Sequence, residues 1–273
     1  MTGVDDLAVP GGCLKVPPGF SVPVDAGALL ASLAAWWAAP EPSWFGEEAP
    51  RRIAGSDMDQ LVPEGTENPY WEIARQLPIS DISLSLPWVT GPELVTHVYV
   101  NGPERWRYFT DLEVLRRTFS WSIPSPGDVA WMKGVLGCRA VVELGAGGGY
   151  WAWQLRQAGV DVAAYEPLQD GGNWYAAREW TAVLKGDHSA AASHPDRALF
   201  LCWPSNGEPW AAEALDGYAG DLLVYAGNRE CCADDRFYEL LATGWEPVSA
   251  SPAHVGYQGV SCILSAWRRK GAS

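Results

Sequence analysis

The stretch that decides the fold is "VVELGAGGGYWAWQL" at residues 141–155. An apolar run that contains Glu143 leads into glycines at alternate positions, and aromatic residues typical of a helix follow. This order predicts a buried strand, a tight turn and a helix. Glycines let a backbone approach a ligand closely, and the first N–H groups of a helix attract polar groups. The stretch is therefore either a nucleotide-binding loop or a tight turn without a ligand.

The spacing of the glycines separates the kinds of nucleotide-binding loop. A dinucleotide loop follows G-x-G-x-x-G, which needs a glycine where Tyr150 stands. A phosphate loop follows G-x-x-x-x-G-K-[ST], which needs the same glycine and then a lysine, whereas Trp151 stands there. The remaining pattern is E-x-G-x-G-x-G from Glu143 to Gly149, which favours neither class.

Strand-like and helix-like segments alternate after this loop. We predict strands at residues 140–144, 160–165, 182–184, 198–202 and 221–226. Helices are expected between most of them, at residues 150–158, 173–180 and 209–218. This alternation indicates an α/β fold with a parallel sheet and right-handed crossovers. The last two strand-like segments lie too close together for a helix and predict an antiparallel hairpin at the sheet edge, at residues 245–251 and 261–267.

The N-terminal part has a different composition, because 15 of the 21 prolines lie at or before Pro126. We expect short helices broken by loops there, and one strand without an identifiable partner at residues 96–101. The three helices are expected from Asp25 to before Pro40, at 66–77 and at 111–119. The prolines of residues 122–126 mark a junction, followed by a helix at 127–137. We therefore predict a mainly helical cap over residues 1–121 and a ligand-binding domain over residues 122–273.

Acidic residues follow the next two predicted strands. Glu166 ends the second strand, 21 residues after Gly145, where an acid can accept hydrogen bonds from both hydroxyls of a ribose. Asp187 follows the third strand with His188 beside it, and its carboxylate can accept a hydrogen bond from an adenine amino group. Each acid also has a plainer interpretation, because Glu166 can be a surface residue and Gly-Asp is a common turn.

These motifs resemble the cofactor-binding motifs of class I S-adenosylmethionine-dependent methyltransferases, over roughly residues 122–267. The resemblance implies a Rossmann-like, mostly parallel sheet of seven strands with an antiparallel C-terminal strand. It implies that Gly145, Gly147 and Gly149 lie under the methionine part of S-adenosylmethionine. Glu143 would hold the amino group of the cofactor, and Glu166 its ribose. The cofactor residues expected in full are Glu143, Gly145, Ala146, Gly147, Gly149, Tyr150, Glu166, Asp187, His188 and Trp203.

Substrate chemistry is expected at the end of the fourth strand. The stretch "LFLCWP" at residues 199–204 is similar to a subgroup of small-molecule methyltransferases, but the chain departs from that subgroup at Ser205 and Asn206. We take these two residues as substrate-binding candidates. The ring of Trp203 can stabilise a sulfonium or can simply pack. Candidates for a general base are His97 and His254, and Tyr175 is a further catalytic candidate in the pocket. Each is also a plausible structural residue.

Composition limits the partners. The net charge of −14 and the presence of four lysines argue against binding a nucleic-acid backbone. The six cysteines form no C-x-x-C pair, so we expect no metal site. The longest apolar segment is well short of the ~20 residues needed to cross a bilayer, so no membrane partner is expected. We expect a cytoplasmic monomer or homodimer that acts on a small-molecule substrate.

Three functions fit these observations. The first is a small-molecule methyltransferase of secondary metabolism, with S-adenosylmethionine as cofactor and a cap that holds seven of the 16 tryptophans. The second uses the same cofactor but attacks its aminocarboxypropyl chain, by transfer or by cyclisation, and releases methylthioadenosine. The third is a non-catalytic binding protein with a methyltransferase fold, because a fold alone does not fix a function.

Overall fold

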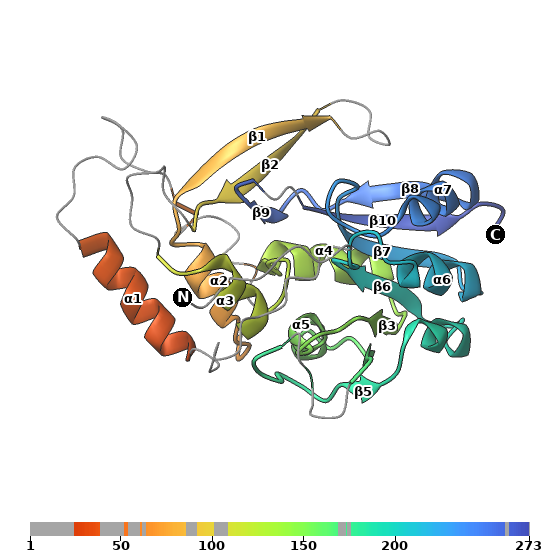
Figure 1. Ribbon diagram of the computed structural model, residues 1–273, viewed down its shortest axis with the longest axis horizontal. Helices are drawn as coiled ribbons and strands as arrows, with labels where there is room; N and C mark the ends of the chain where they lie inside the picture. Colours follow the sequence, from red (N-terminus) through yellow and green to blue (C-terminus); the bar gives the residue numbers. More distant parts are fainter. Residues whose placement is uncertain are drawn as a thin grey trace, which may run out of the picture.

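The computed structural model places a large sheet with its helices beside a smaller cap (Figure 1). The structure describes residues 25–38, 52–53, 61, 64–85, 92–100, 109–168, 173, 176–259 and 262–272. For residues 82–85 and 92–95 it describes the backbone alone. None of the helices in these ranges is both long enough and apolar enough to cross a membrane.

The large sheet is a Rossmann-like, mostly parallel sheet of seven strands in the order β5-β4-β3-β6-β7-β10-β8. The strands are β3 (Val141–Leu144), β4 (Val162–Glu166), β5 (Leu184–Lys185), β6 (Ala198–Cys202), β7 (Leu222–Gly227), β8 (Trp245–Ala250) and β10 (Ile263–Arg269). The first five run parallel, and β10 is antiparallel to both β7 and β8. The predicted fold class is confirmed, and β10 lies inside the sheet while β8 forms its edge.

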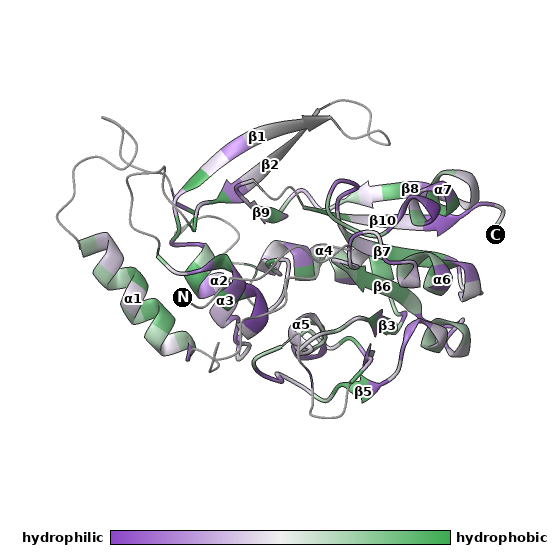
Figure 2. Cartoon of the chain, in the orientation of Figure 1, coloured by the Kyte–Doolittle hydropathy of each residue, from purple (hydrophilic) through white to green (hydrophobic). Residues whose placement is uncertain are grey.

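The central strands are apolar on both faces because helices cover both sides (Figure 2). Leu199 and Leu201 of β6 pack with the side chains of α6 (Trp210–Gly217) and α7 (Asp235–Gly244). Phe200, between them, points to the other face with the side chains of α4 (Pro126–Leu136) and α5 (Tyr150–Gln157). Side chains that alternate along a strand therefore build two separate cores.

The strand order reverses direction at β3. The chain goes from β3 to β4 and β5 on one side of the sheet, and then returns to pair β6 with the other side of β3. A six-residue 3-10 helix, His188–Ser193, makes part of the return. A crevice opens at the carboxyl ends of the strands at such a reversal. The glycine loop that follows β3 lies at this position.

In its described residues the cap has three helices and a three-stranded sheet in the order β1-β2-β9. Its elements are α1 (Ala26–Ala38), α2 (Pro69–Ala74), β1 (Ile79–Ser85), β2 (Pro92–Val98), α3 (Leu112–Thr118) and β9 (Val255–Tyr257). The strand expected at 96–101 is part of β2, and it pairs antiparallel with β1 and parallel with β9. The partner β9 comes from the chain between β8 and β10, far away in the sequence (Figure 1).

Tyr150, the first residue of α5, joins the cap to the sheet. Its hydroxyl accepts the N–H of Tyr70 at 2.9 Å and donates to Oδ1 of Asn68 at 2.8 Å. The same Asn68 oxygen caps the N-terminus of α2. The Tyr150 ring contacts the rings of Phe119 and Trp180 at centroid distances of 5.4 and 4.9 Å. Burial without partners would be costly for this hydroxyl, so the cap and α5 depend on each other.

The helix predicted at residues 173–180 is wrong, because its described residues, 173 and 176–180, form no helix. The backbone of this segment instead forms hydrogen bonds with the glycine loop on one side and with α3 on the other. The N–H of Trp180 donates to the carbonyl of Gly148 at 2.8 Å, and the N–H of Ala177 donates to the carbonyl of Arg117 at 2.8 Å. These long-range bonds take the backbone groups that a helix would use.

The close packing of this segment on the glycine loop predicts a large effect for Gly148→Ala. The added methyl carbon would overlap the carbonyl oxygen of Arg178, and the bond from Trp180 leaves little freedom to move apart. We expect a loss of about 1–3 kcal/mol in the free energy of unfolding, measured by urea titration. Gly134→Ala is the matched control, because Gly134 is exposed in α4 and an added methyl carbon there would meet no atom within 4 Å. It should gain about 0.5–1 kcal/mol; equal midpoints for the two variants would contradict the packing argument.

Candidate active site

A cavity of about 430 Å³ lies at the carboxyl ends of β3, β4, β5 and β6, between the large sheet and α3 of the cap. Its floor comes from the loops after these strands, and its cap-side wall comes from α3 and the residues that follow it. The lining side chains and loops used below are Glu143 to Gly148, Glu166, Asp187, His188, Trp203, Ser205, Asn206, Glu208, Glu113, Arg116, Arg117, Phe119 and Trp121.

The glycine loop is shaped by two positive φ angles in the cavity wall. Gly145 has a φ of 68° and Gly147 a φ of 54°, which is the region that favours glycine. A side chain at 145 would meet the ring of Trp210 at 3.0 Å, whereas the space in front of Gly147 is open. The N–H of Ala146 donates to the carbonyl of Tyr165 at 3.0 Å, which ties the loop to β4. The loop therefore presents bare backbone to the cavity.

Glu143 is the most unusual ionisable group of the site. Its side chain is 1% exposed, lines the cavity and has an Oε2 atom without a hydrogen-bond partner in the described part of the chain. Burial raises its pKa to about 8; Arg156 opposes the rise and the nearby Glu166 carboxyl adds to it. The carboxyl is thus largely protonated at neutral pH, and a cation placed beside it would favour the ionised form.

Glu166 ends β4 on the same side of the cavity. Its Oε2 atom accepts the N–H of Gly147 at 2.8 Å, so the carboxylate also holds the glycine loop. Burial raises its pKa, and the bond from Gly147 opposes that rise. Its other carboxylate oxygen has no hydrogen-bond partner within the described ranges and remains available to a hydroxyl-bearing ligand.

Asp187 and His188 line the end of the cavity beside β5. Oδ1 of Asp187 caps the 3-10 helix by accepting the N–H of Ser189 at 2.9 Å and its hydroxyl at 2.6 Å. These bonds lower the pKa of Asp187. His188 lies 3.4 Å from a carboxylate oxygen of Glu213. The capping bonds account for one oxygen of Asp187 and leave the second to a ligand.

Trp203 stands at the end of β6 with a φ of 53°, which is rare for a large side chain. Its indole N–H donates to Sγ of Cys262 at 3.1 Å, and its ring stacks on Trp121 at a centroid distance of 5.9 Å. Ser205 and Asn206 follow it along the cavity wall. A strained backbone held by specific contacts is typical of functional sites.

The cap contributes three charged residues to which the sequence analysis assigned no role. Glu113, Arg116 and Arg117 line the cavity from α3. Burial raises the pKa of Glu113, and the two arginines lower it. Their spacing of three and four residues places them on one face of a helix. That spacing was the available signal, but which face of the expected helix meets a cavity depends on the tertiary fold.

Two other predicted site residues lie outside the cavity wall. Gly149 backs onto Thr181 and Val183, and Tyr150 is buried in the contact with the cap. Ala146, by contrast, lines the cavity together with the other predicted members of the loop. Tyr175 lies outside the described residues. The loop pattern thus points to a strand end that borders the cavity, but it does not show which of its residues face the cavity.

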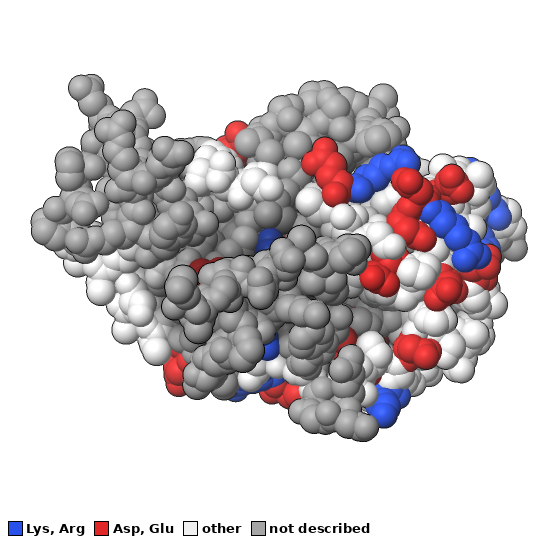
Figure 3. Space-filling view, viewed as in Figure 1, with Lys and Arg blue, Asp and Glu red and all other residues white. Residues whose placement is uncertain are grey.

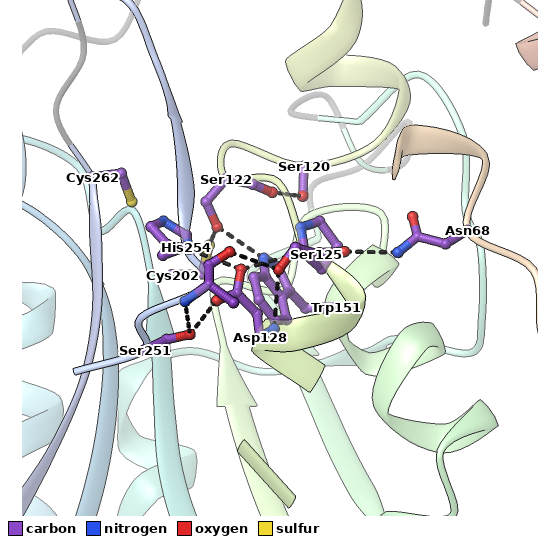
Figure 4. A network of polar contacts seen from close by, with 12 residues as sticks. Asn68, Ser120, Ser122, Ser125, Asp128, Trp151, Cys202, Ser251, His254 and Cys262 are labelled. Carbon is purple, nitrogen blue, oxygen red and sulfur yellow. Dashed lines mark hydrogen bonds and ion pairs between the residues drawn. The ribbon is translucent and has the colours of Figure 1, made fainter. Parts of the chain in front are cut away.

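The two candidate histidines do not line the cavity either. Nδ1 of His254 lies 2.9 Å from Oδ2 of Asp128, and the other carboxylate oxygen accepts the hydroxyl of Ser251 at 2.6 Å (Figure 4). Asp128 also forms the capping box of α4 with Ser125. His97 is buried in β2 at the position that pairs with Gly256. These contacts give both histidines a structural place in the junction of the cap and the sheet.

The polar network of Figure 4 continues toward the cavity through Ser122. The indole N–H of Trp151 donates to the Ser122 hydroxyl at 3.0 Å, and that hydroxyl lies 3.3 Å from Sγ of Cys202. Asn68 of the cap donates to the carbonyl of Pro124 at 2.7 Å. The junction at residues 122–126 is therefore fixed to β6, α5 and the cap. Among the described residues, no group of three His, Cys, Asp or Glu side chains is arranged to hold a metal ion.

Comparisons with known proteins give structural likeness only. No protein-family model matches the chain, and no curated protein matches it. A glycopeptide N-methyltransferase complexed with S-adenosylhomocysteine is 13% identical, covers 52% of this chain and 89% of its own, and has a TM-score of 0.38. The 1,6-didemethyltoxoflavin-N1-methyltransferase of Burkholderia thailandensis is 16% identical, with coverages of 53% and 76% and a TM-score of 0.32. The magnesium protoporphyrin IX methyltransferase of Synechocystis is 12% identical, with coverages of 52% and 76% and a TM-score of 0.35.

The placement of His97 predicts a pH dependence of stability. Burial and the nearby His254 lower the pKa of His97 below its usual value. The unfolded chain therefore takes up a proton near pH 6.5, where the folded chain does not. This contribution to stability is present above that pH and is lost as the pH falls below it.

The test compares urea midpoints between pH 8 and pH 5.5 for the wild type and His97→Gln. We expect the variant to lose less stability than the wild type on acidification. His188→Gln is the control, because His188 is half-buried on the cavity wall, and it should keep the slope of the wild type. Parallel slopes for wild type and His97→Gln would show that His97 does not carry the effect.

Proposed function

We propose that this protein is an S-adenosylmethionine-dependent methyltransferase that acts on a small molecule. The observation that carries the proposal is the buried Glu143, with an unpartnered oxygen, next to the bare backbone of the glycine loop. A buried carboxyl of this kind needs a cation or a hydrogen-bond donor. The amino group of the methionine part of the cofactor supplies both.

The rest of the cavity suits the same cofactor. Glu166 lies one strand further along, where its free oxygen can accept the ribose hydroxyls while the other oxygen holds Gly147. Asp187 lies beyond it at the end of β5, on the side proposed for the adenine. The three acids follow the order β3, β4 and β5 across the sheet. The proposed order of methionine, ribose and adenine matches this line of acids.

When bound, the cofactor supplies an electrophilic methyl group, and the chain has to align an acceptor and exclude water. Phe119 and Trp121 of the cap and Trp203 of the sheet provide aromatic walls at the end of the cavity beside β6. Glu113 on the cap side is a carboxyl with a raised pKa in the same wall. We propose that it takes the proton that an oxygen or nitrogen acceptor loses.

We extend the proposal to secondary metabolism on the resemblance of residues 199–204 to the "LFLCWP" subgroup. The departure from that subgroup at Ser205 and Asn206 keeps one alternative open, which is attack on the aminocarboxypropyl chain. Both residues line the cavity at the acceptor end, so they bear on which carbon of the sulfonium is attacked.

The pKa of Glu143 leads to a prediction about binding. S-adenosylhomocysteine carries the same amino group, so its binding should drive a proton off Glu143 and release it to the buffer. Its affinity should rise by up to about tenfold per pH unit between pH 6 and 8, as expected for loss of one proton. Isothermal titration in buffers with different heats of ionisation measures both the affinity and the released proton.

Glu143→Gln should weaken binding and remove both the pH dependence and the proton release. Glu208→Gln is the control, because it removes a carboxylate from an exposed position on the same cavity wall. That control should keep the affinity and the pH dependence of the wild type. If the wild type does not bind at millimolar ligand, the proposed function is wrong.

The nucleoside product distinguishes the two reactions. We expect incubation with S-adenosylmethionine and a filtered extract of small metabolites to yield S-adenosylhomocysteine, detected by mass spectrometry and absent with heat-inactivated protein. Methylthioadenosine as the only enzyme-dependent product would replace methyl transfer with attack on the aminocarboxypropyl chain. Ligand binding without either product would favour the non-catalytic alternative.

A further inference from the structure

The charges of the cavity are unevenly distributed. Glu143, Glu166 and Asp187 lie at the ends of β3, β4 and β5, which is the cofactor end in the proposed function. The opposite end lies over β6, on the other side of β3. Arg116 of α3 reaches that end, because its guanidinium lies 5.7 Å from the ring centroid of Trp203. The cavity thus has an acidic end with three carboxyls, and an end over β6 where Arg116 lies near the carboxyl of Glu113.

Arg116 is held over aromatic rings. Its guanidinium carbon is 4.6 Å from the ring centroid of Trp121, and Trp121 stacks on Trp203. Guanidinium groups favour such positions because the ring face carries negative charge. A guanidinium over a ring face still has its N–H groups available for hydrogen bonds at its edge.

The hydrogen-bonding capacity of Arg116 is not used by the described residues. Its Nε atom is buried without a hydrogen-bond partner, and no ion pair joins its guanidinium to a carboxylate in that part of the chain. The charge of Arg116 lowers the pKa of Glu113, but the two side chains are too far apart to form an ion pair. A buried donor of this kind is costly unless a ligand accepts from it.

Two other arginines on the described surface do have carboxylate partners. Arg236 pairs with Asp216 at 2.9 Å, and Arg229 pairs with Asp235 at 3.4 Å. Figure 3 shows acidic and basic side chains interspersed on the face above α6 and α7. In a chain with a net charge of −14, a carboxylate partner is easy to supply. Arg116 lacks one at the place where an acceptor would bind.

We propose that the cavity over β6 binds a planar acceptor that carries a carboxylate, held by Arg116 above the Trp121–Trp203 stack. This inference rests on the proposed function, because it concerns the acceptor of that reaction. Arginine matches a carboxylate with two parallel hydrogen bonds, and the aromatic wall takes an unsaturated ring. A cavity of about 430 Å³ shared with the cofactor restricts the acceptor to a small molecule.

The acidic end of the cavity also helps to orient the acceptor. An acceptor carboxylate is repelled by Glu166 and Asp187 and attracted by Arg116, so it binds on the side away from β4 and β5. The opposite edge of the acceptor ring then faces the cofactor end. Arg116 is therefore a specificity residue that selects for acids, and it does not take part in the transfer itself.

The experiment uses naphthalene-2-carboxylate and its neutral analogue naphthalene-2-carboxamide as probes. Binding of each is measured by isothermal titration to the full chain saturated with S-adenosylhomocysteine, with the Tm of each variant as a check of folding. We expect the carboxylate to bind the wild type about 10- to 100-fold more tightly than the carboxamide, as for a charge-assisted hydrogen bond. Arg116→Met should abolish this preference and leave the affinity for S-adenosylhomocysteine unchanged.

Arg229→Met is the matched control, because the Arg229 guanidinium also lies over a ring, that of Tyr238 at 5.3 Å, outside the cavity wall. It should keep the preference for the acid. If Arg116→Met does not fold, Arg116→Lys keeps the charge and should retain part of the preference. In the wild type, the affinity for the carboxylate should fall between 50 and 500 mM NaCl, while that for the carboxamide should stay constant.

The outcomes separate the two proposals. Failure of the wild type to bind S-adenosylhomocysteine would overturn the proposed function and remove the basis of this inference. Binding of S-adenosylhomocysteine together with equal affinities for the two probes would overturn the inference alone. A preference for the acid that persists in Arg116→Met would also overturn it, and would leave Arg116 as a residue that only packs on Trp121.

Discussion

The contact of the Tyr150 hydroxyl with α2 holds the site together. Tyr150 directly follows the glycine loop, and its hydroxyl is bonded to both Tyr70 and Asn68 of the cap. The loop therefore cannot be positioned independently of the cap that covers the cavity. Because the phenol is fully buried, each of its bonds has to form for the contact to be favourable. The residue that rules out a dinucleotide loop in the sequence is thus the one that fixes the cap to the sheet.

Two buried carboxyls, those of Glu143 and Glu166, lie together in the wall of the cavity. Glu143 and Glu166 lie close enough to influence each other and are both removed from water. Keeping a carboxyl neutral in this way lowers the cost of burial, and a cationic ligand can then restore the charge. The basic group of Arg116 lies instead on the cap side of the cavity, over the rings of Trp121 and Trp203. This distribution of charges is the basis of the acceptor orientation that we propose.

The sequence predicted the parts of the structure that depend on local patterns. The E-x-G-x-G-x-G loop, the acid at the end of β4 and the antiparallel hairpin each have a spacing that can be read along the chain. The parts that depend on long-range packing were not predictable. The chain near Trp180 forms no helix because its backbone bonds to Gly148, and Arg116 faces the cavity because of how α3 docks.

The histidines illustrate the same limit from the chemical side. His254 was a candidate base because of its residue type and its loop position before the last strand. Its contact with Asp128 is formed across 126 residues of sequence, and no local pattern indicates it. Residue type is a useful guide at a strand end, where the fold itself directs side chains to a crevice. Elsewhere in the chain, the residue type alone does not indicate whether a side chain points to the crevice.

The origin of β9 has a consequence for how the protein is made. This strand completes the sheet of the cap, yet it follows six of the seven strands of the large sheet in the chain. During synthesis the residues of β1 and β2 emerge long before Tyr257, so the edge of β2 has to wait without its partner. The sheet of the cap can therefore be completed only after the parallel part of the large sheet has left the ribosome. Completion of the cap sheet is thus a late step of folding, which follows synthesis of the strands that precede β9 in the chain.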